Sequence, residues 1–107
     1  MRKFLMRAAR LGDAARVRAL LAAGEDVDET DGGGYAALME ASRYGQEPVA
    51  RLLIEAGADL EKANNAGHTA LELACMFDHD ACTCLLIDAG ASAAGISELE
   101  ERLREGG

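Results

Sequence analysis

The chain has 107 residues, a length typical of one domain and close to the size at which a hydrophobic core becomes marginal. Half of the residues are hydrophobic but only 4% are aromatic, and the single proline and the scarcity of β-branched runs argue against a sheet. The net charge of −8 argues against a nucleic-acid partner, because the phosphate backbone would repel the protein.

The charge is unevenly distributed along the chain. Residues 1–18 carry six basic side chains against Asp13 alone, so the remainder of the chain is strongly acidic. The N-terminal residues contain no apolar run long enough for a signal peptide, and no segment approaches the ~20 apolar residues that span a bilayer. We therefore expect a soluble intracellular protein, cytoplasmic or nuclear, with no membrane partner.

The sequence repeats itself with a period of 33 residues. A shift by one period places residues of the same type on one another: Leu5, Leu38 and Leu71; Ala8, Ala41 and Ala74; Gly24, Gly57 and Gly90. A fixed period of this length, found without gaps over three copies, is typical of stacked helical repeats.

Apolar residues at helical spacing predict two helices in each repeat, joined by a short loop that makes them an antiparallel pair. The expected helices cover residues 3–11, Asp13 to Gly24, 37–44, Gly45 to Ala56, Thr69 onwards, and 80–89.

The helix boundaries are marked by capping and turn residues. Pro48 lies in the first turn of its helix, where it loses no hydrogen bond, and Thr69 is a capping residue. Asp78 stands where the other repeats have Gly12 and Gly45 between their helices. Because Asp tolerates the left-handed conformation less well than Gly, we expect this loop to be slightly strained or reshaped.

Two polar loops separate the repeats. The first, from Glu25 to Gly34, holds five acids and three glycines and is expected to form a solvated turn. The second, from Asp59 to Gly67, contains the turn-forming pair Asn64-Asn65. After the third repeat, Ser97 to Glu100 forms a capping-box sequence, which predicts a short terminal helix over 97–105 that caps the stack.

The segment Gly67-His-Thr69-Ala-Leu71-Glu-Leu-Ala74 is similar to the Gly-x-Thr-Pro-Leu-His-x-Ala motif of the ankyrin repeat. Both full repeats then continue with a Leu-Leu pair and a Gly-Ala pair, as that family does. The resemblance, which covers residues 4–95, implies an all-α fold: an ankyrin-repeat solenoid of stacked antiparallel helix pairs with turn loops and a C-terminal capping helix. We expect one domain over residues 1–107, with repeats at about 1–30, 31–63 and 64–96 and the capping helix at 97–105.

The second repeat departs from the family motif at the start of its first helix. Residues 36–39 read Ala-Ala-Leu-Met in place of Thr-Pro-Leu-His. The Thr and His of the motif tie the loop to the helix by hydrogen bonds in the family, so the resemblance implies a less rigid loop base in this repeat.

Members of the ankyrin family bind proteins through loop tips and the inner helix face, and the period assigns those positions in this chain. The candidate partner-binding residues on the concave face are Arg10, Leu11, Tyr35, Arg43, Tyr44, His68, Met76 and Phe77. Large aromatic side chains at positions that the core does not use fit binding hot spots. The alternative is that these side chains simply cover the short loops beneath them.

Cysteine and histidine residues raise the alternative of a metal site. Cys75, His79, Cys82 and Cys84 are residue types that bind zinc. On a helix, however, Cys82 and Cys84 point about 200° apart, so one ion cannot easily reach both. We favour reduced, buried thiols. We also expect no cofactor and no enzymatic activity, because no nucleophile motif or phosphate-binding loop is present.

The sequence thus predicts a monomeric, non-enzymatic module that binds another protein. The acidic stretch from Asp26 to Asp31 would steer a basic segment of that partner. The alternative is a structural or self-associating unit, either a fragment of a longer array or a homodimer.

Overall fold

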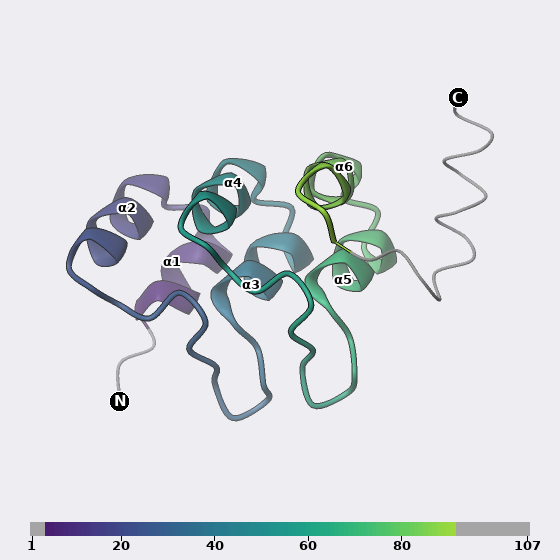
Figure 1. The fold of residues 1–107 in the computed structure, drawn as a ribbon, viewed down its shortest axis with the longest axis horizontal. Helices are drawn as coiled ribbons and strands as arrows, with labels where there is room; N and C mark the ends of the chain where they lie inside the picture. The colour runs from purple at the N-terminus through teal and green to yellow at the C-terminus, as the bar shows by residue number, and fades with distance from the viewer. Residues whose placement is uncertain (1–3, 92–107) are drawn as a thin grey trace.

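The computed structural model of the chain describes residues 4–91 and, within them, contains six α-helices. They form three antiparallel pairs along the chain, one pair for each repeat (Figure 1). The pairs are α1 (Phe4–Leu11) with α2 (Ala14–Ala22), α3 (Ala37–Arg43) with α4 (Glu47–Glu55), and α5 (Ala70–Met76) with α6 (Asp80–Asp88). The all-helical repeat architecture predicted from the period is confirmed.

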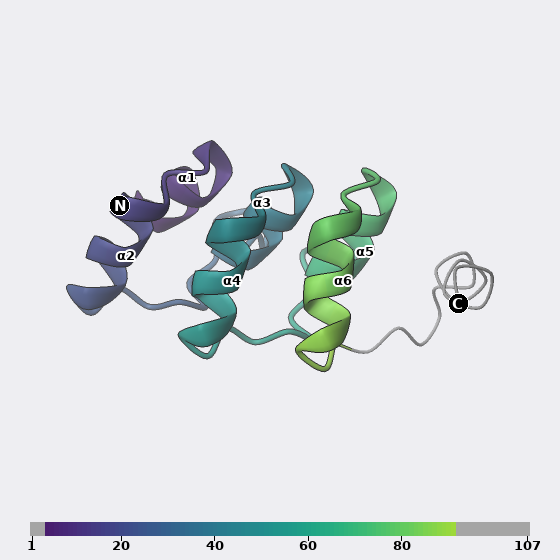
Figure 2. The ribbon, with the colours of Figure 1, turned by 90° about the horizontal axis from the view of Figure 1, so that it is seen from above.

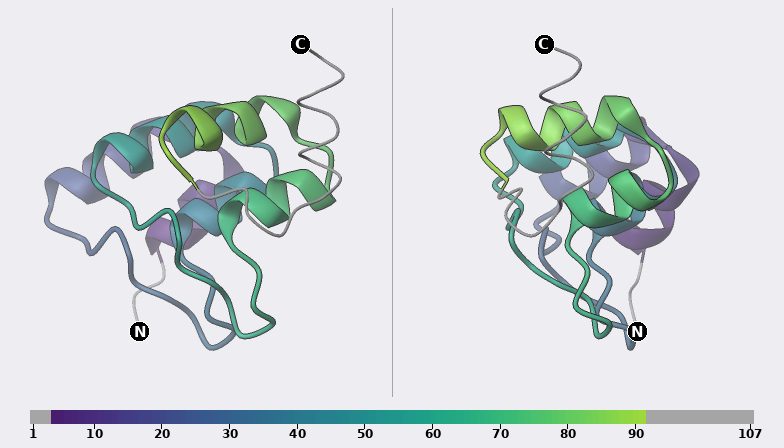
Figure 3. Two further views of the ribbon diagram at one scale, coloured as in Figure 1. Left: turned by 45° about the vertical axis from the view of Figure 1, so that its right-hand side comes forward. Right: turned by 90° about the vertical axis from the view of Figure 1, so that its right-hand side faces the viewer.

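The helices are arranged in two layers. The inner helices α1, α3 and α5 pack side by side in one layer, and the outer helices α2, α4 and α6 form the other, as the view from above shows (Figure 2). The two long loops project from the inner layer on the side away from the outer helices (Figure 3). One edge of the stack is therefore formed by loops, and another by the short turns between paired helices.

The core lies between the layers and between successive repeats. Leu5, Leu38 and Leu71 occupy equivalent places and are all buried, as are the equivalent alanines of the three inner helices. Small side chains let neighbouring helices approach closely, while the leucines supply the apolar area that stabilises the stack. The residues that define the period are therefore the residues that build the core.

The helices begin within two residues of the expected positions, with different caps. Asp13 caps α2, since its Oδ1 accepts a hydrogen bond from the Arg16 N–H at 3.0 Å. Thr69 and Glu72 form a reciprocal capping box at the start of α5. Ala36, in the same position before α3, makes no side-chain hydrogen bond. The departure of the second repeat from the family motif therefore leaves its helix without this cap.

Asp78 takes the conformation of the glycines that it replaces. Its φ is +59°, beside +76° at Gly12 and +71° at Gly45, so the turn between α5 and α6 keeps the left-handed shape. The turn is therefore not reshaped. The left-handed conformation is strained at Asp78 because this residue, unlike glycine, has a Cβ.

The acidic loop is more ordered than a solvated tip. The Asp31 Oδ1 accepts hydrogen bonds from the N–H groups of Gly33 and Tyr35, both at 2.9 Å. Asn64, one period later, accepts the same two bonds from Ala66 and His68. The first loop is also tied to the second, because the Asp28 carboxylate accepts a hydrogen bond from the Asp59 N–H. Three of the five acids of this loop, Asp26, Asp28 and Asp31, therefore accept hydrogen bonds from the backbone of the two loops.

Further bonds join the two loops at their tips. The Asn65 side chain donates to the Gly32 carbonyl and its backbone N–H donates to Gly33, at 3.0 and 2.9 Å. An isolated β-bridge closes the base of each loop, Thr30 with Ala36 and Ala63 with Thr69.

Two further expectations concern the C-terminal capping helix and the absence of a membrane-spanning segment. The capping helix at 97–105 lies outside the described residues and stays a prediction. Among the helices of residues 4–91, none combines the length and apolar character needed to cross a bilayer.

Candidate functional site

Three large apolar side chains stand exposed where the inner helices end. Leu11 is the last residue of α1, and Tyr44 and Phe77 follow the last residues of α3 and α5. Their exposed fractions are 68%, 42% and 49%. We call these three residues the turn row, because they line the edge formed by the helix–helix turns. Leaving such side chains in water is unfavourable, so the row is a candidate contact surface.

Arg43 is held between two aromatic rings in the central repeat. Its guanidinium carbon lies 5.2 Å from the ring centre of Tyr35 and 5.1 Å from that of Tyr44. A guanidinium at this distance from a ring is attracted by its π electrons. The same group lies 3.7 Å from the Glu40 carboxylate. Three of the predicted site residues, Tyr35, Arg43 and Tyr44, are therefore brought together, and their arrangement is held before any partner arrives.

Glu40 is a member of this cluster that the sequence analysis missed. It is 7% exposed, and burial raises the pKa of its carboxyl above the ordinary value. The positive charges of Arg43 and Arg10 lower that pKa in part, and the Asp31 carboxylate raises it further. The period offered no signal, since the matching residues are Arg7 and Leu73. The only indication was an acid within a helix face that is otherwise apolar.

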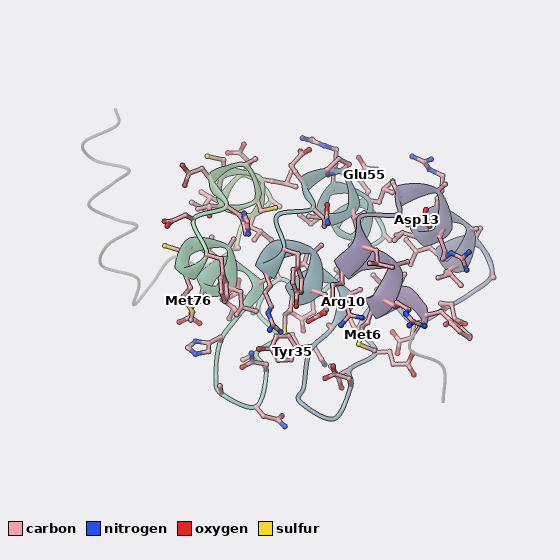
Figure 4. The ribbon with its side chains drawn as sticks, turned by 180° about the vertical axis from the view of Figure 1, so that it is seen from behind. Met6, Arg10, Asp13, Tyr35, Glu55 and Met76 are labelled. Carbon is pink, nitrogen blue, oxygen red and sulfur yellow. The ribbon has the colours of Figure 1, made fainter. Side chains whose placement is uncertain are left out.

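Arg10 of the first repeat, and Met76 and His68 of the third, extend the surface on the two sides of the Arg43 cluster. Arg10 is exposed on α1, on the same face of the molecule as Tyr35 (Figure 4). Met76 is 55% exposed at the end of α5, one residue before Phe77. His68 is half-buried at the base of the second loop, where its N–H donates to Asn64. The eight predicted residues thus lie on or beside the inner helices, with the densest contacts around Arg43.

Gln46 links the first two repeats next to this surface. Its side-chain amide donates a hydrogen bond of 3.0 Å to the Arg10 carbonyl. The same side chain packs over Gly12, where a Cβ would overlap it, and the His79 ring packs over Gly45 in the equivalent way. These contacts hold the turns, and with them the turn row, at a defined spacing.

The three cysteines are in different environments. Cys82 is buried, Cys75 is half-buried and Cys84 is exposed, so the expectation of three buried thiols is wrong for Cys84. Cys82 and Cys84 point to opposite sides of α6, which leaves only one of them in the core. Burial raises the pKa of the Cys82 thiol to about 11, with a smaller contribution from Glu47. Among residues 4–91, no three His, Cys, Asp or Glu side chains are grouped to hold a metal ion.

The stacked helix pairs, tight turns and projecting loops define a helical-repeat protein of the solenoid class. A family model described as ankyrin repeats, in three copies, matches residues 5–94 of this chain. The chain therefore belongs to the ankyrin repeat family. A search of curated proteins finds no match to it.

Proposed function

We propose that this chain is a non-enzymatic protein-binding module that uses the face of its inner helices. Ankyrin repeats are generally protein–protein interaction modules, and the face here carries the chemistry for that role. The observation that carries the proposal is the turn row: three large apolar side chains, one from each repeat, exposed along one edge.

The rest of the face complements the row. Arg43 is pre-positioned between Tyr35 and Tyr44, so it loses little conformational freedom when a partner contacts it. Tyrosine and arginine are, with tryptophan, the residues enriched in binding hot spots. The acidic stretch from Asp26 to Asp31 also orders the loop by accepting backbone hydrogen bonds, and its acidic character favours a basic segment of the partner.

Paired alanine substitutions in the turn row test the proposal. Tyr44→Ala and Phe77→Ala remove two exposed rings, so we expect helicity and cooperative melting to be retained. Proximity labelling with the wild-type chain and with this variant identifies the partner by the difference between the two. The free energy of binding between this partner and the double variant should then be weaker than for the wild type by about 2 kcal/mol or more, as measured by calorimetry.

Glu55→Ala, at the end of the outer helix α4 away from the turns, is the control and should leave binding unchanged. If the double variant unfolds, the two rings are structural and the site assignment is wrong. If it folds and binds the partner as the wild type does, the partner uses another surface.

The proposed module acts as a monomer. Static light scattering of the purified chain over a wide concentration range should give one constant molecular mass. A mass that rises with concentration would favour the alternative of a self-associating unit.

A further inference from the structure

The turn row has a regular spacing along the stack. Leu11, Tyr44 and Phe77 occupy equivalent positions at the ends of α1, α3 and α5, and these helices pack in sequence. The axes of packed helices lie about 8–10 Å apart, so successive members of the row are separated by roughly that distance. The row therefore presents three apolar side chains, evenly spaced, over roughly 20 Å.

An α-helix has a matching period. It rises 1.5 Å per residue, so side chains seven residues apart lie about 10 Å apart along its axis. Seven residues are also close to two whole turns, and the face drifts by only about 20° over that interval. Apolar residues at i, i+7 and i+14 of one helix can thus meet all three members of the row. An extended strand repeats each face about every 7 Å and matches the row less well.

The two sides of the row carry opposite charge. On the inner-layer side, the residues that precede Leu11 and Tyr44 are Arg10 and Arg43. On the outer-layer side, Asp13 caps α2, and Glu47 and Asp80 are the first residues of α4 and α6. Figure 4 shows Arg10 beside the inner helix α1 and Asp13 at the outer helix α2. Asp13 and Glu47 also pair with Arg16 and Arg51 of their own helices. The first pair is exposed and the second is partly exposed, so solvent weakens both.

From this spacing and charge pattern we propose that the turn row binds an amphipathic α-helix of a partner protein, which lies along the stack. The helix carries apolar residues at heptad spacing, acidic residues on the flank that faces Arg10 and Arg43, and basic residues on the opposite flank. This proposal rests on the proposed function and adds to it the shape and charge of the partner segment.

A peptide display selection tests the proposal directly. The library holds 21-residue peptides with an alanine-rich helical background, in which every position samples apolar, acidic and basic residues. It is selected on the immobilised full-length chain and counter-selected on the Tyr44→Gln variant. We expect the recovered peptides to share apolar residues at i, i+7 and i+14, with acids on one flank and bases on the other.

Binding of one recovered peptide to single variants then locates it. Leu11→Gln, Tyr44→Gln and Phe77→Gln should each weaken binding about tenfold, whereas Glu55→Gln, at the end of α4 away from the turns, should not change it. Peptides with both flanks acidic or both flanks basic should bind several-fold more weakly, and raising the salt concentration should reduce this difference. Circular dichroism of each variant establishes that the fold is retained.

The possible results separate the two proposals. Peptides that depend on Tyr44 but lack the seven-residue spacing, or that bind without helical structure, overturn the helix proposal and leave the proposed function standing. If no recovered peptide depends on any member of the turn row, both proposals are wrong.

Discussion

Asp78 and Glu40 each differ in chemical type from their counterparts in the other repeats, and each difference affects stability. Asp78 holds a left-handed turn that Gly12 and Gly45 form elsewhere, and it places a negative charge at the carboxyl end of α5. The left-handed turn is unfavourable for steric reasons, whereas the charge also lies next to the amino end of α6, where a negative charge is favourable. Glu40 is a carboxylate at a position that holds a buried leucine in the third repeat.

Replacing Asp78 by glycine should stabilise the protein. Glycine adopts the observed φ without steric strain, so Asp78→Gly should raise the free energy of unfolding by about 0.5–1 kcal/mol, measured by urea denaturation. The control is Gly45→Ala, which should lose more than about 1 kcal/mol. Its φ is +71° and the new Cβ would meet the His79 ring. A loss of stability in Asp78→Gly would mean that the Asp78 side chain contributes more than its backbone strain removes.

The stability of the Glu40→Gln variant should depend on pH. Burial raises the pKa of this carboxyl above its ordinary 4.5, so the folded state holds the proton more tightly than the unfolded state. Stability is therefore lost as the pH rises from the unfolded pKa through the folded pKa, and the loss is constant at higher pH. At pH 7 the glutamine variant should be more stable than the wild type, and this gain should shrink as the pH falls toward 4.5. Urea denaturation of both proteins from pH 7 to pH 4 measures it, and a gain independent of pH would contradict the assignment.

At the scale of the elements, the repeats share one backbone plan and differ in how it is capped. The loops before α3 and α5 use Asp31 and Asn64 in the same way, to accept two backbone hydrogen bonds each. The helices that follow do not match: α5 has a full capping box and α3 has none. Since a cap contributes about 1 kcal/mol, the central repeat contains a helix that is less stable by itself.

Removing the cap of α5 and adding a cap to α3 should change the free energy of unfolding in opposite directions. Thr69→Ala should lower the free energy of unfolding by about 1 kcal/mol, because the Glu72 N–H loses its acceptor. Ala36→Thr should raise it by about 0.5 kcal/mol, since the hydroxyl supplies the missing acceptor at the start of α3. Guanidinium denaturation of both variants measures the changes. If Ala36→Thr destabilises the protein, the buried site before α3 does not accept the larger side chain.

Much of this element-level plan follows from the sequence alone. The glycine and proline positions, together with the apolar period, place the helix ends within a residue or two, as for residues 37–44 and α3 (Ala37–Arg43). The cluster around Arg43 does not follow from the sequence. Its contacts with Tyr35 and Glu40 depend on how a long side chain bends back along the helix. Neither does the exposure of Cys84, which depends on the rotation of α6 against its neighbour.

At the scale of the whole molecule, stability comes from contacts between successive repeats. Each inner helix packs on the next, and the outer helices do the same. Among residues 4–91, the central repeat contributes to two interfaces and the first repeat to one. Leu53 in α4 is fully buried between its neighbours, whereas Leu20, one period earlier in α2, is only half-buried.

Equivalent substitutions in the two repeats should therefore have unequal effects. Leu53→Ala should cost about 2–5 kcal/mol, because it leaves a cavity within the stack. Leu20→Ala should cost about 1–2 kcal/mol, since part of its surface is already in water. Thermal and urea unfolding of both variants measure the difference. Equal losses would mean that stability is not transmitted between repeats in the way the stacking implies.

The bonds that Asn65 and Asp28 make between the two loops have a mechanical consequence. Asn65 donates hydrogen bonds to the carbonyls of Gly32 and Gly33, and the Asp28 carboxylate accepts one from the Asp59 N–H. The two loops are therefore connected both at the tip and nearer the base. A pull on either loop is shared with its neighbour. The two loops therefore move together as one rigid unit and not independently of each other.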